Sequence, residues 1–321
     1  MPYIEHSTYR AKGVFKNGHV NTIYASVFRP MPALQYQRER LTTPDLDFID
    51  LDWSVVGSDS FALILHGLES STERPYIKWM VQRFNQAGWD AAALNFRGCS
   101  GEPNRLLRSY HIGETDDTHF VLESILQQKD YRRVVLVGFS LGGNVVLKYL
   151  GENASRLPKA LKAGVAFSVP CDIITANVEI HKWHNKLYLL NFMKSLNEKI
   201  AIKRSFFDDQ MPMPQKRPST FHEFDGHFTA PIHGFESAEH YWTANSCIHF
   251  LPRLARPALL VNALDDSFLS APCYPYDVAR TSSNLFLETP LSGGHVGFTT
   301  QLGKGAFWSE DRAIEFIQSV T

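Results

Sequence analysis

Short runs of apolar residues alternate with segments of helical periodicity through the first half of the chain. Four runs have the length of a strand and carry few charges: residues 61–65, 90–95, 133–137 and 163–167. Such runs are typical of parallel strands that are buried on both faces. Helices are expected between or after them, over residues 75–87, 114–128 and 141–150. The alternation predicts an α/β fold, a mostly parallel central sheet flanked by helices.

The alternation is interrupted between about residues 172 and 250. This stretch has helical patches and many aromatic residues, but no clear buried strand. The pattern then resumes in four segments, 257–261, 271–280, 284–287 and 309–320. We therefore expect a single domain over residues 1–321, with a helical cap inserted at about 172–250 above the carboxyl edge of the sheet, where ligands bind in open α/β folds. Residues 1–50, which are mixed in composition, are expected to form an N-terminal arm lying on this domain.

A Gly-x-Ser-x-Gly motif, Gly138 to Gly142, stands where the third apolar run meets a helix. In that context the serine occupies a sharp turn, and the flanking glycines let the strand and the helix approach closely. A simple glycine-rich turn is the alternative, but the strand–turn–helix setting favours a catalytic residue. The motif therefore predicts that Ser140 is the nucleophile of a serine hydrolase, provided that a base can take its proton.

His295 and one of two adjacent aspartates are the expected partners of Ser140. In α/β-hydrolases the chain order is serine, acid, histidine, and His295 lies in a glycine-rich loop after the last expected strand. Asp265 and Asp266 both follow the strand at 257–261, and one of them should accept the His295 Nδ1–H bond. Asp266 is preferred, because it aligns with the acid of the common strand–Gly-x-x-Asp–x-x-x-Pro pattern. Asp265 stays open as the alternative, and would otherwise be a turn carboxylate bonding its own backbone.

Two backbone N–H groups are needed to bind the negative charge of a tetrahedral intermediate. One is expected from Leu141, the residue after the nucleophile, and the other from Leu68, in the turn after the first apolar run. Gly67 is the alternative to Leu68. Together these residues predict acyl transfer through an acyl-enzyme on Ser140.

Several segments in combination resemble the YheT-type branch of the α/β-hydrolases, a group of predicted esterases with eukaryotic relatives that act on lipid esters and on acyl transfer to alcohols. The resemblance runs from about residue 15 to the end of the chain and implies a Ser140–Asp266–His295 triad. Family members usually have glycine where Ser70 or Ser71 stands. The resembling segments are 66–71, 95–102, 110–117, 138–144, 223–225 with 234–235, and 262–266.

Composition narrows the range of partners. The formal net charge is −1 and no long basic run is present, so nucleic acid is not expected as a partner. The four cysteines show no metal spacing and are expected to be buried in a reducing compartment. No segment approaches the roughly 20 apolar residues that span a bilayer, and no signal peptide is apparent. We expect a cytoplasmic protein without cofactor or metal; the sequence leaves its oligomeric state open.

The expected function is that of a carboxylic ester hydrolase acting on a small-molecule ester with an apolar acyl group. An acyltransferase that passes the same acyl group to an alcohol is the first alternative, and a ligand-binding homologue without catalysis is the second. The aromatic stretch at residues 183–193 is expected to be the packing face of the cap, with an acyl tunnel or a membrane contact as the alternatives.

Overall fold

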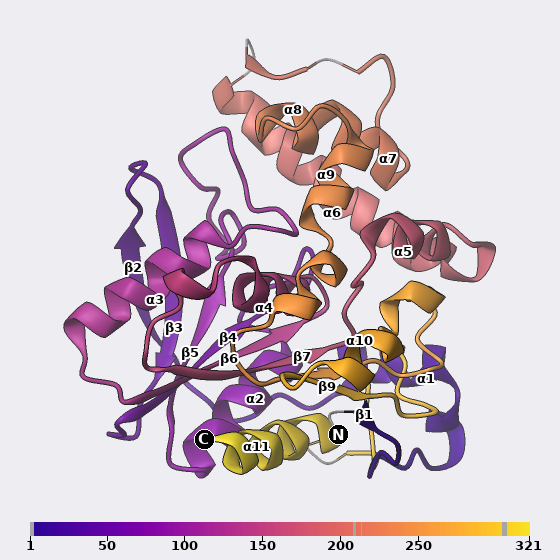
Figure 1. The fold of residues 1–321 in the computed structure, drawn as a ribbon. Helices are drawn as coiled ribbons and strands as arrows, with labels where there is room; N and C mark the ends of the chain where they lie inside the picture. Colours follow the sequence, from indigo (N-terminus) through magenta and orange to yellow (C-terminus); the bar gives the residue numbers. More distant parts are fainter. Residues whose placement is uncertain (1–2, 208–209, 213, 304–306) are drawn as a thin grey trace.

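A computed structural model describes residues 3–207, 210–212, 214–303 and 307–321, and these residues form one sheet of nine strands. The strand order is β1-β9-β8-β7-β6-β4-β5-β3-β2. All neighbours are parallel except the β3–β5 and β2–β3 pairs, which are antiparallel. The expected α/β fold with a mostly parallel sheet is confirmed (Figure 1). The strands are β1 (Tyr3–Ile4), β2 (Gln37–Thr42), β3 (Phe48–Ser54), β4 (Ser60–Leu65), β5 (Asp90–Asn95), β6 (Arg133–Phe139), β7 (Leu161–Phe167), β8 (Ala258–Val261) and β9 (Leu285–Glu288).

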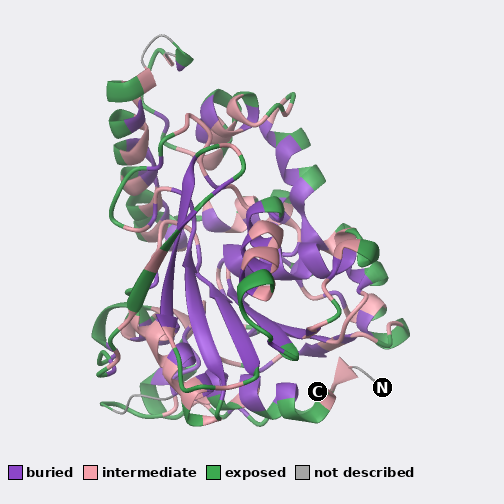
Figure 2. Ribbon diagram, turned by 90° about the vertical axis from the view of Figure 1, so that its left-hand side faces the viewer, coloured by how far each residue is buried: buried purple, intermediate pink, exposed green. Residues whose placement is uncertain are grey.

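Helices cover both faces of this sheet. Alternate residues of a strand point to opposite faces, so Leu63 and Leu65 of β4 belong to one apolar core and Ile64 belongs to the other. The first core is completed by α3 (Asp116–Gln128), α4 (Leu141–Glu152) and α10 (Tyr276–Thr281). The second is completed by α2 (Pro75–Gln86) and α11 (Trp308–Val320). The central strands are therefore buried on both sides, as Figure 2 shows.

The N-terminal residues contribute strands as well as loops. The sequence predicts an arm over residues 1–50. The structure places β1, β2 and the start of β3 there, with α1 (Gly18–Ile23) and a π-helical turn at Tyr24–Phe28 between β1 and β2. Among the described strands β2 pairs only with β3, at one end of the sheet, and its outer side chains include Arg38 and Arg40. Of its six residues only Leu41 is buried, so its sequence shows no apolar run.

Between β7 and β8 the described residues form helices and no strand. They are α5 (Ile173–Ile180), α6 (Lys186–Phe207), α7 (Phe221–Phe224), α8 (Ala230–Ile232) and α9 (Ala238–Asn245), with a 3-10 turn at Trp183–Asn185 and a π-helical turn at Asp225–Thr229. These α5–α9 helices stand together above the sheet (Figure 1). They carry two small apolar clusters of their own, one around Met193 and Phe228 and one around Ile173 and Trp242.

None of the described helices is long and apolar enough to cross a membrane. All four cysteines are buried and unpaired, as the sequence predicts.

Candidate active site

Ser140 stands on a sharp turn between β6 and α4. Its backbone has φ 53° and ψ −116°, a conformation that costs energy for a residue with a side chain. The turn leaves no room for side chains at the two motif glycines. A Cβ on Gly138 would collide with the backbone of Gly142, and a Cβ on Gly142 would lie 2.5 Å from the carbonyl oxygen of His66. The Gly-x-Ser-x-Gly pattern therefore follows from the close approach of α4 to β6 and to the end of β4.

Ser140, His295 and Asp266 form a continuous chain of hydrogen bonds. His295 Nε2 lies 2.9 Å from Ser140 Oγ, and His295 Nδ1 lies 2.8 Å from Asp266 Oδ2. The Asp266 side chain is fully buried, and its second oxygen accepts a bond from the Phe268 N–H at 3.0 Å. An Nδ1–H that donates to Asp266 leaves Nε2 free to accept the Ser140 proton, so the arrangement sets the tautomer that a general base needs.

The imidazole of His295 is also held by its neighbours. The ring of Phe268 packs against it with centroids 4.3 Å apart. The His295 N–H donates to Thr22 Oγ1 of α1 at 2.8 Å, and the Val296 N–H donates to Ser168 Oγ at 2.9 Å. The loop is thus anchored to the N-terminal segment and to the end of β7. Phe268 and Thr22 are far from His295 in sequence, so no local pattern could have identified them.

Asp265 has a different environment from Asp266. Its Oδ1 accepts the Gly294 N–H at 2.8 Å, while its Oδ2 is buried without a hydrogen-bond partner among the described residues. Burial raises the pKa of this carboxyl. Asp265 therefore contacts the backbone of the histidine loop and not the imidazole, and the structure brings together only Asp266 with Ser140 and His295.

The turn after β4 presents three consecutive backbone N–H groups. Gly67 donates to the Tyr76 hydroxyl at 3.1 Å, and Glu69 donates to the Tyr110 hydroxyl at 2.9 Å. The N–H of Leu68, between them, has no acceptor within the described part of the chain. Of the two residues that the sequence left open, Leu68 is thus the one with a free donor.

Leu141 is the first residue of α4, so its N–H has no acceptor within the helix. The N-terminal end of a helix also carries a partial positive charge. The N–H groups of Leu68 and Leu141 both belong to residues that border the cavity containing Ser140. They are suited to bind an oxyanion formed on a carbonyl that Ser140 attacks.

His66 holds this turn from behind. It is fully buried, and burial lowers its pKa to about 3. Its Nδ1 lies 2.7 Å from the Gly67 carbonyl oxygen, and its Nε2 accepts the Phe96 N–H at 3.3 Å. A neutral ring satisfies both bonds, so His66 supports the turn and does not act as a second base.

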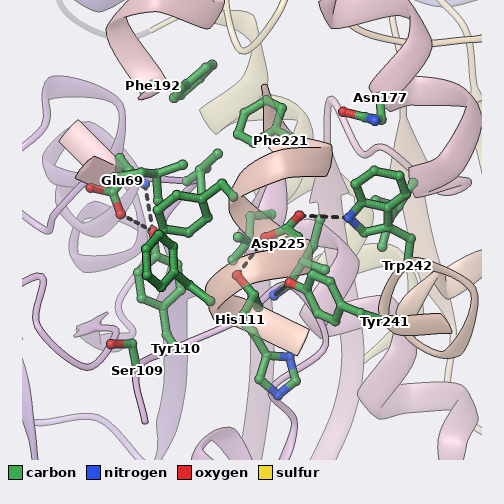
Figure 3. Close-up of a pocket in the computed structure, with 18 of the residues that line it drawn as sticks. Glu69, Ser109, Tyr110, His111, Asn177, Phe192, Phe221, Asp225, Tyr241 and Trp242 are labelled. Atoms are coloured by element: carbon green, nitrogen blue, oxygen red, sulfur yellow. Dashed lines mark hydrogen bonds between the residues drawn. The ribbon is translucent and has the colours of Figure 1, made fainter. Parts of the chain in front are cut away.

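Glu69 ties the same turn to α6. Its carboxylate accepts bonds from the hydroxyls of Tyr110 and Ser195, both at 2.7 Å, and pairs with Lys199 at 3.0 Å. The bond to Tyr110 is visible in Figure 3. Glu69 has φ +51°, so it occupies a strained turn position that these partners hold in place. Glu69 belongs to segment 66–71, which resembles the YheT-type branch. Its partners Tyr110, Ser195 and Lys199 come close to it only in the folded chain.

A cavity of about 190 Å³ opens above Ser140. Leu68, Ser140, Leu141 and His295 line it together with many residues of the α5–α9 helices. Figure 3 shows some of these helix residues, among them Asn177, Phe192, Phe221 and Trp242. Most of the wall is apolar, including Ile173, Ile180, Phe192, Leu196, Phe228 and Trp242. Such a lining suits a hydrocarbon chain.

Asp225 is a buried carboxyl that lines this cavity, as Glu69 does. Asp225 accepts bonds from Thr229 Oγ1 at 2.6 Å and from Trp242 Nε1 at 2.8 Å (Figure 3). Burial raises its pKa to about 6. In the described part of the chain, no cluster of three or more His, Cys, Asp or Glu side chains could hold a metal ion.

Comparison with known proteins places the chain in a family. A family profile described as alpha/beta hydrolase fold matches residues 63–301. An Escherichia coli protein named "Putative esterase YheT" is 32% identical over 88% of this chain and 85% of its own length. The chain belongs to the alpha/beta hydrolase family. The resemblance to the YheT-type branch is thereby confirmed.

More distant relatives of this alpha/beta hydrolase carry lipase names. A mouse protein named Phospholipase ABHD3 is 27% identical over 90% of this chain and 73% of its own length. A human protein named Monoacylglycerol lipase ABHD2 is 27% identical over 95% and 78%. Among solved structures, the esterase Pf2001 of Pyrococcus furiosus aligns with a TM-score of 0.59 at 17% identity, over 91% of this chain and 98% of that one. At that identity the likeness shows the fold alone.

Proposed function

We propose that this alpha/beta hydrolase is a serine esterase that cleaves carboxylic esters through an acyl-enzyme. Ser140 is the nucleophile, His295 the general base and Asp266 the acid that orients it. The observation that carries the proposal is the chain of hydrogen bonds from Ser140 through His295 to Asp266, at 2.9 and 2.8 Å, on the floor of an apolar cavity. We take the chain to be one domain, with the α5–α9 helices as its cap.

The reaction follows from these positions. Ser140 Oγ attacks the ester carbonyl carbon as its proton passes to His295 Nε2, and Asp266 stabilises the imidazolium that forms. The N–H groups of Leu68 and Leu141 donate to the oxyanion. His295 then gives its proton to the leaving alcohol oxygen. In the second half, His295 takes a proton from water as its oxygen attacks the acyl-enzyme carbonyl. His295 then returns that proton to Ser140 Oγ as the acyl–Oγ bond breaks, which releases the carboxylic acid and regenerates the free serine.

An apolar acyl group is the substrate feature that the cavity supports best. The wall formed by α5 to α9 is largely hydrocarbon and aromatic. The names of the relatives, an esterase, a phospholipase and a monoacylglycerol lipase, agree with an ester that carries a fatty chain. The four unpaired, buried cysteines agree with a cytoplasmic location.

The test is hydrolysis of p-nitrophenyl esters from acetate to long acyl chains by the wild type and by Ser140→Ala. The proposal requires activity in the wild type, a preference for a longer acyl chain over acetate, and a loss of at least about a thousandfold in the variant. Added ethanol measures where the acyl group goes. Free acid as the main product supports hydrolysis, whereas mainly ethyl ester would identify an acyltransferase. A folded wild type that is inactive on the whole series would contradict esterase action.

A further inference from the structure

The first half of α6 carries apolar side chains on its exposed side as well as on its buried side. Its inner face carries Leu189 and Met193, which are buried against the other cap helices. Its outer face carries Leu187 and Leu190, which are 81% and 53% exposed, and Trp183 in the turn just before the helix is 87% exposed. The inner residues account for the packing face expected from the sequence. The outer residues are left in solvent.

The outer residues form an ordered stripe. Leu187 and Leu190 are three residues apart on α6, so they project from one side of the helix, and Trp183 lies in the 3-10 turn that leads into it. Val178 of the neighbouring α5 is also 61% exposed. Single exposed apolar side chains are ordinary, but a cluster with a nearly free tryptophan marks a surface that meets another apolar phase.

Basic side chains surround the stripe. Lys182, Lys186 and Lys194 are all exposed. Lys182 pairs with Glu179 at 2.6 Å, whereas Lys186 and Lys194 form no ion pair with any described residue. The stripe is thus bordered by two lysines that have no ion-pair partner among the described residues, with one exposed acidic residue, Glu198, a turn beyond Lys194. Tryptophan and leucine beside lysine are the combination that binds the boundary between lipid headgroups and acyl chains of an anionic membrane.

The same charges disfavour a second copy of this chain as the occupant. In a two-fold interface the same patch meets itself. Such an interface would bring Lys186 and Lys194 of both copies into one contact, and gathering like charges in an interface is costly. An anionic lipid surface instead offers the opposite charge.

α1 lies against α6 and adds to this exposed apolar surface. His19 of α1 stacks on Tyr188 of α6, with centroids 5.8 Å apart and planes 11° apart. α1 itself exposes Val20 and Ile23, at 40% and 43%, so apolar side chains lie on two adjoining helices. The opposite side of α6 carries Phe192, which lines the cavity.

We propose that Trp183, Leu187 and Leu190, with Lys186 and Lys194, form a docking surface that binds the protein peripherally to anionic lipid membranes. The side chains insert only to the level of the headgroups, and the lysines add attraction to the negative surface. Binding needs no turnover, so it does not depend on the proposed esterase activity. Docking would hold the wall of the cavity next to the lipid.

Co-sedimentation with vesicles tests this proposal. The probes are vesicles of phosphatidylcholine and phosphatidylglycerol in equal parts, and vesicles of phosphatidylcholine alone. We expect the wild type to bind the anionic vesicles more tightly than the neutral ones. Trp183→Ser with Leu187→Ser should weaken binding by about tenfold or more, because both insertions are lost. Val55→Ser is the matched control. Val55 is 50% exposed directly after β3, several strands away in the sheet from β7 and β8, between which the α5–α9 helices are inserted. This variant should bind vesicles like the wild type.

Three results would overturn the proposal: a wild type that binds neither vesicle, a double variant that binds as well as the wild type, or a wild-type dimer in light scattering that the double variant dissociates. The last would assign the surface to a second copy. Hydrolysis of a short soluble ester by the double variant, expected at the wild-type rate, reports that the variant is folded. Ser140→Ala should bind vesicles like the wild type, so failure of the esterase proposal and failure of docking are distinguishable.

Discussion

The two adjacent aspartates should respond very differently to replacement by asparagine. In Asp266→Asn, the new Oδ1 can still accept the Phe268 N–H, which leaves the amide nitrogen facing His295 Nδ1, where the carboxylate oxygen now lies at 2.8 Å. An amide N–H donates, so Nδ1 must become the acceptor and the proton must move to Nε2. A protonated Nε2 cannot take the Ser140 proton. We expect kcat to fall about 10⁴-fold, which corresponds to about 5.4 kcal/mol of transition-state stabilisation.

Asp265→Asn is the matched control, one residue away. Its Oδ1 can still accept the Gly294 N–H, and its second position has no partner in the described structure to lose. The change also removes a carboxyl whose pKa burial raises. We expect kcat within about tenfold of the wild type. The assay is kcat on a short p-nitrophenyl ester, with circular dichroism to establish folding. Equal losses in the two variants, or a larger loss at 265, would refute the assignment of the acid.

Three further changes test the surroundings of the site. Burial raises the pKa of Asp225 to about 6 from 3.8, so the wild type loses stability as the pH rises through that interval. The free energy of unfolding of Asp225→Asn, measured in urea, should therefore rise by up to about 3 kcal/mol relative to that of the wild type between pH 4 and pH 7. A difference that does not depend on pH would contradict this prediction. Glu69→Gln should lower kcat roughly tenfold with a smaller effect on KM, because the bond from Ser195 and the adjoining ion pair position the turn that carries the oxyanion donor; an effect on KM alone would argue against that role. Gly142→Ala should cost about 1–3 kcal/mol of unfolding free energy, because the new Cβ would crowd the His66 carbonyl; a variant within about 0.5 kcal/mol of the wild type would show that the turn relaxes.

Local patterns predict the central part of the fold. β4 and β6 each contain a continuous apolar run, for example residues 61–65 of β4. These runs are apolar because helices cover both faces of the sheet. Where only one side has a neighbour, the pattern fails: β2 is a strand with the sequence QRERLT, and only its pairing with β3 makes it one. β1 has two residues and pairs with a strand near the other end of the chain, which no local sequence window reports.

The candidate site also has residues that the local sequence predicts and residues that only the fold identifies. Ser140 is recognisable because its turn needs two glycines in the immediate sequence, and those requirements are local. The sequence ranked Asp266 above Asp265, but only the three-dimensional arrangement brings one of the two carboxylates to the imidazole. No sequence pattern predicts the roles of Phe268 and Tyr76. The ring of Phe268 packs on His295 and the hydroxyl of Tyr76 accepts the Gly67 N–H, and both contacts exist only in the folded chain.

The central claim is that Ser140 is an activated nucleophile, and intact-mass measurement after treatment with a fluorophosphonate tests it most directly. The hydroxyl attacks phosphorus, fluoride leaves, and the adduct stays because the site cannot hydrolyse it quickly. The account predicts one phosphonyl group per chain, mapped by peptide mass spectrometry to Ser140, with no adduct on Ser140→Ala and greatly slowed labelling of Asp266→Asn. An unlabelled but folded wild type, or equal labelling of the wild type and Ser140→Ala, would contradict the account.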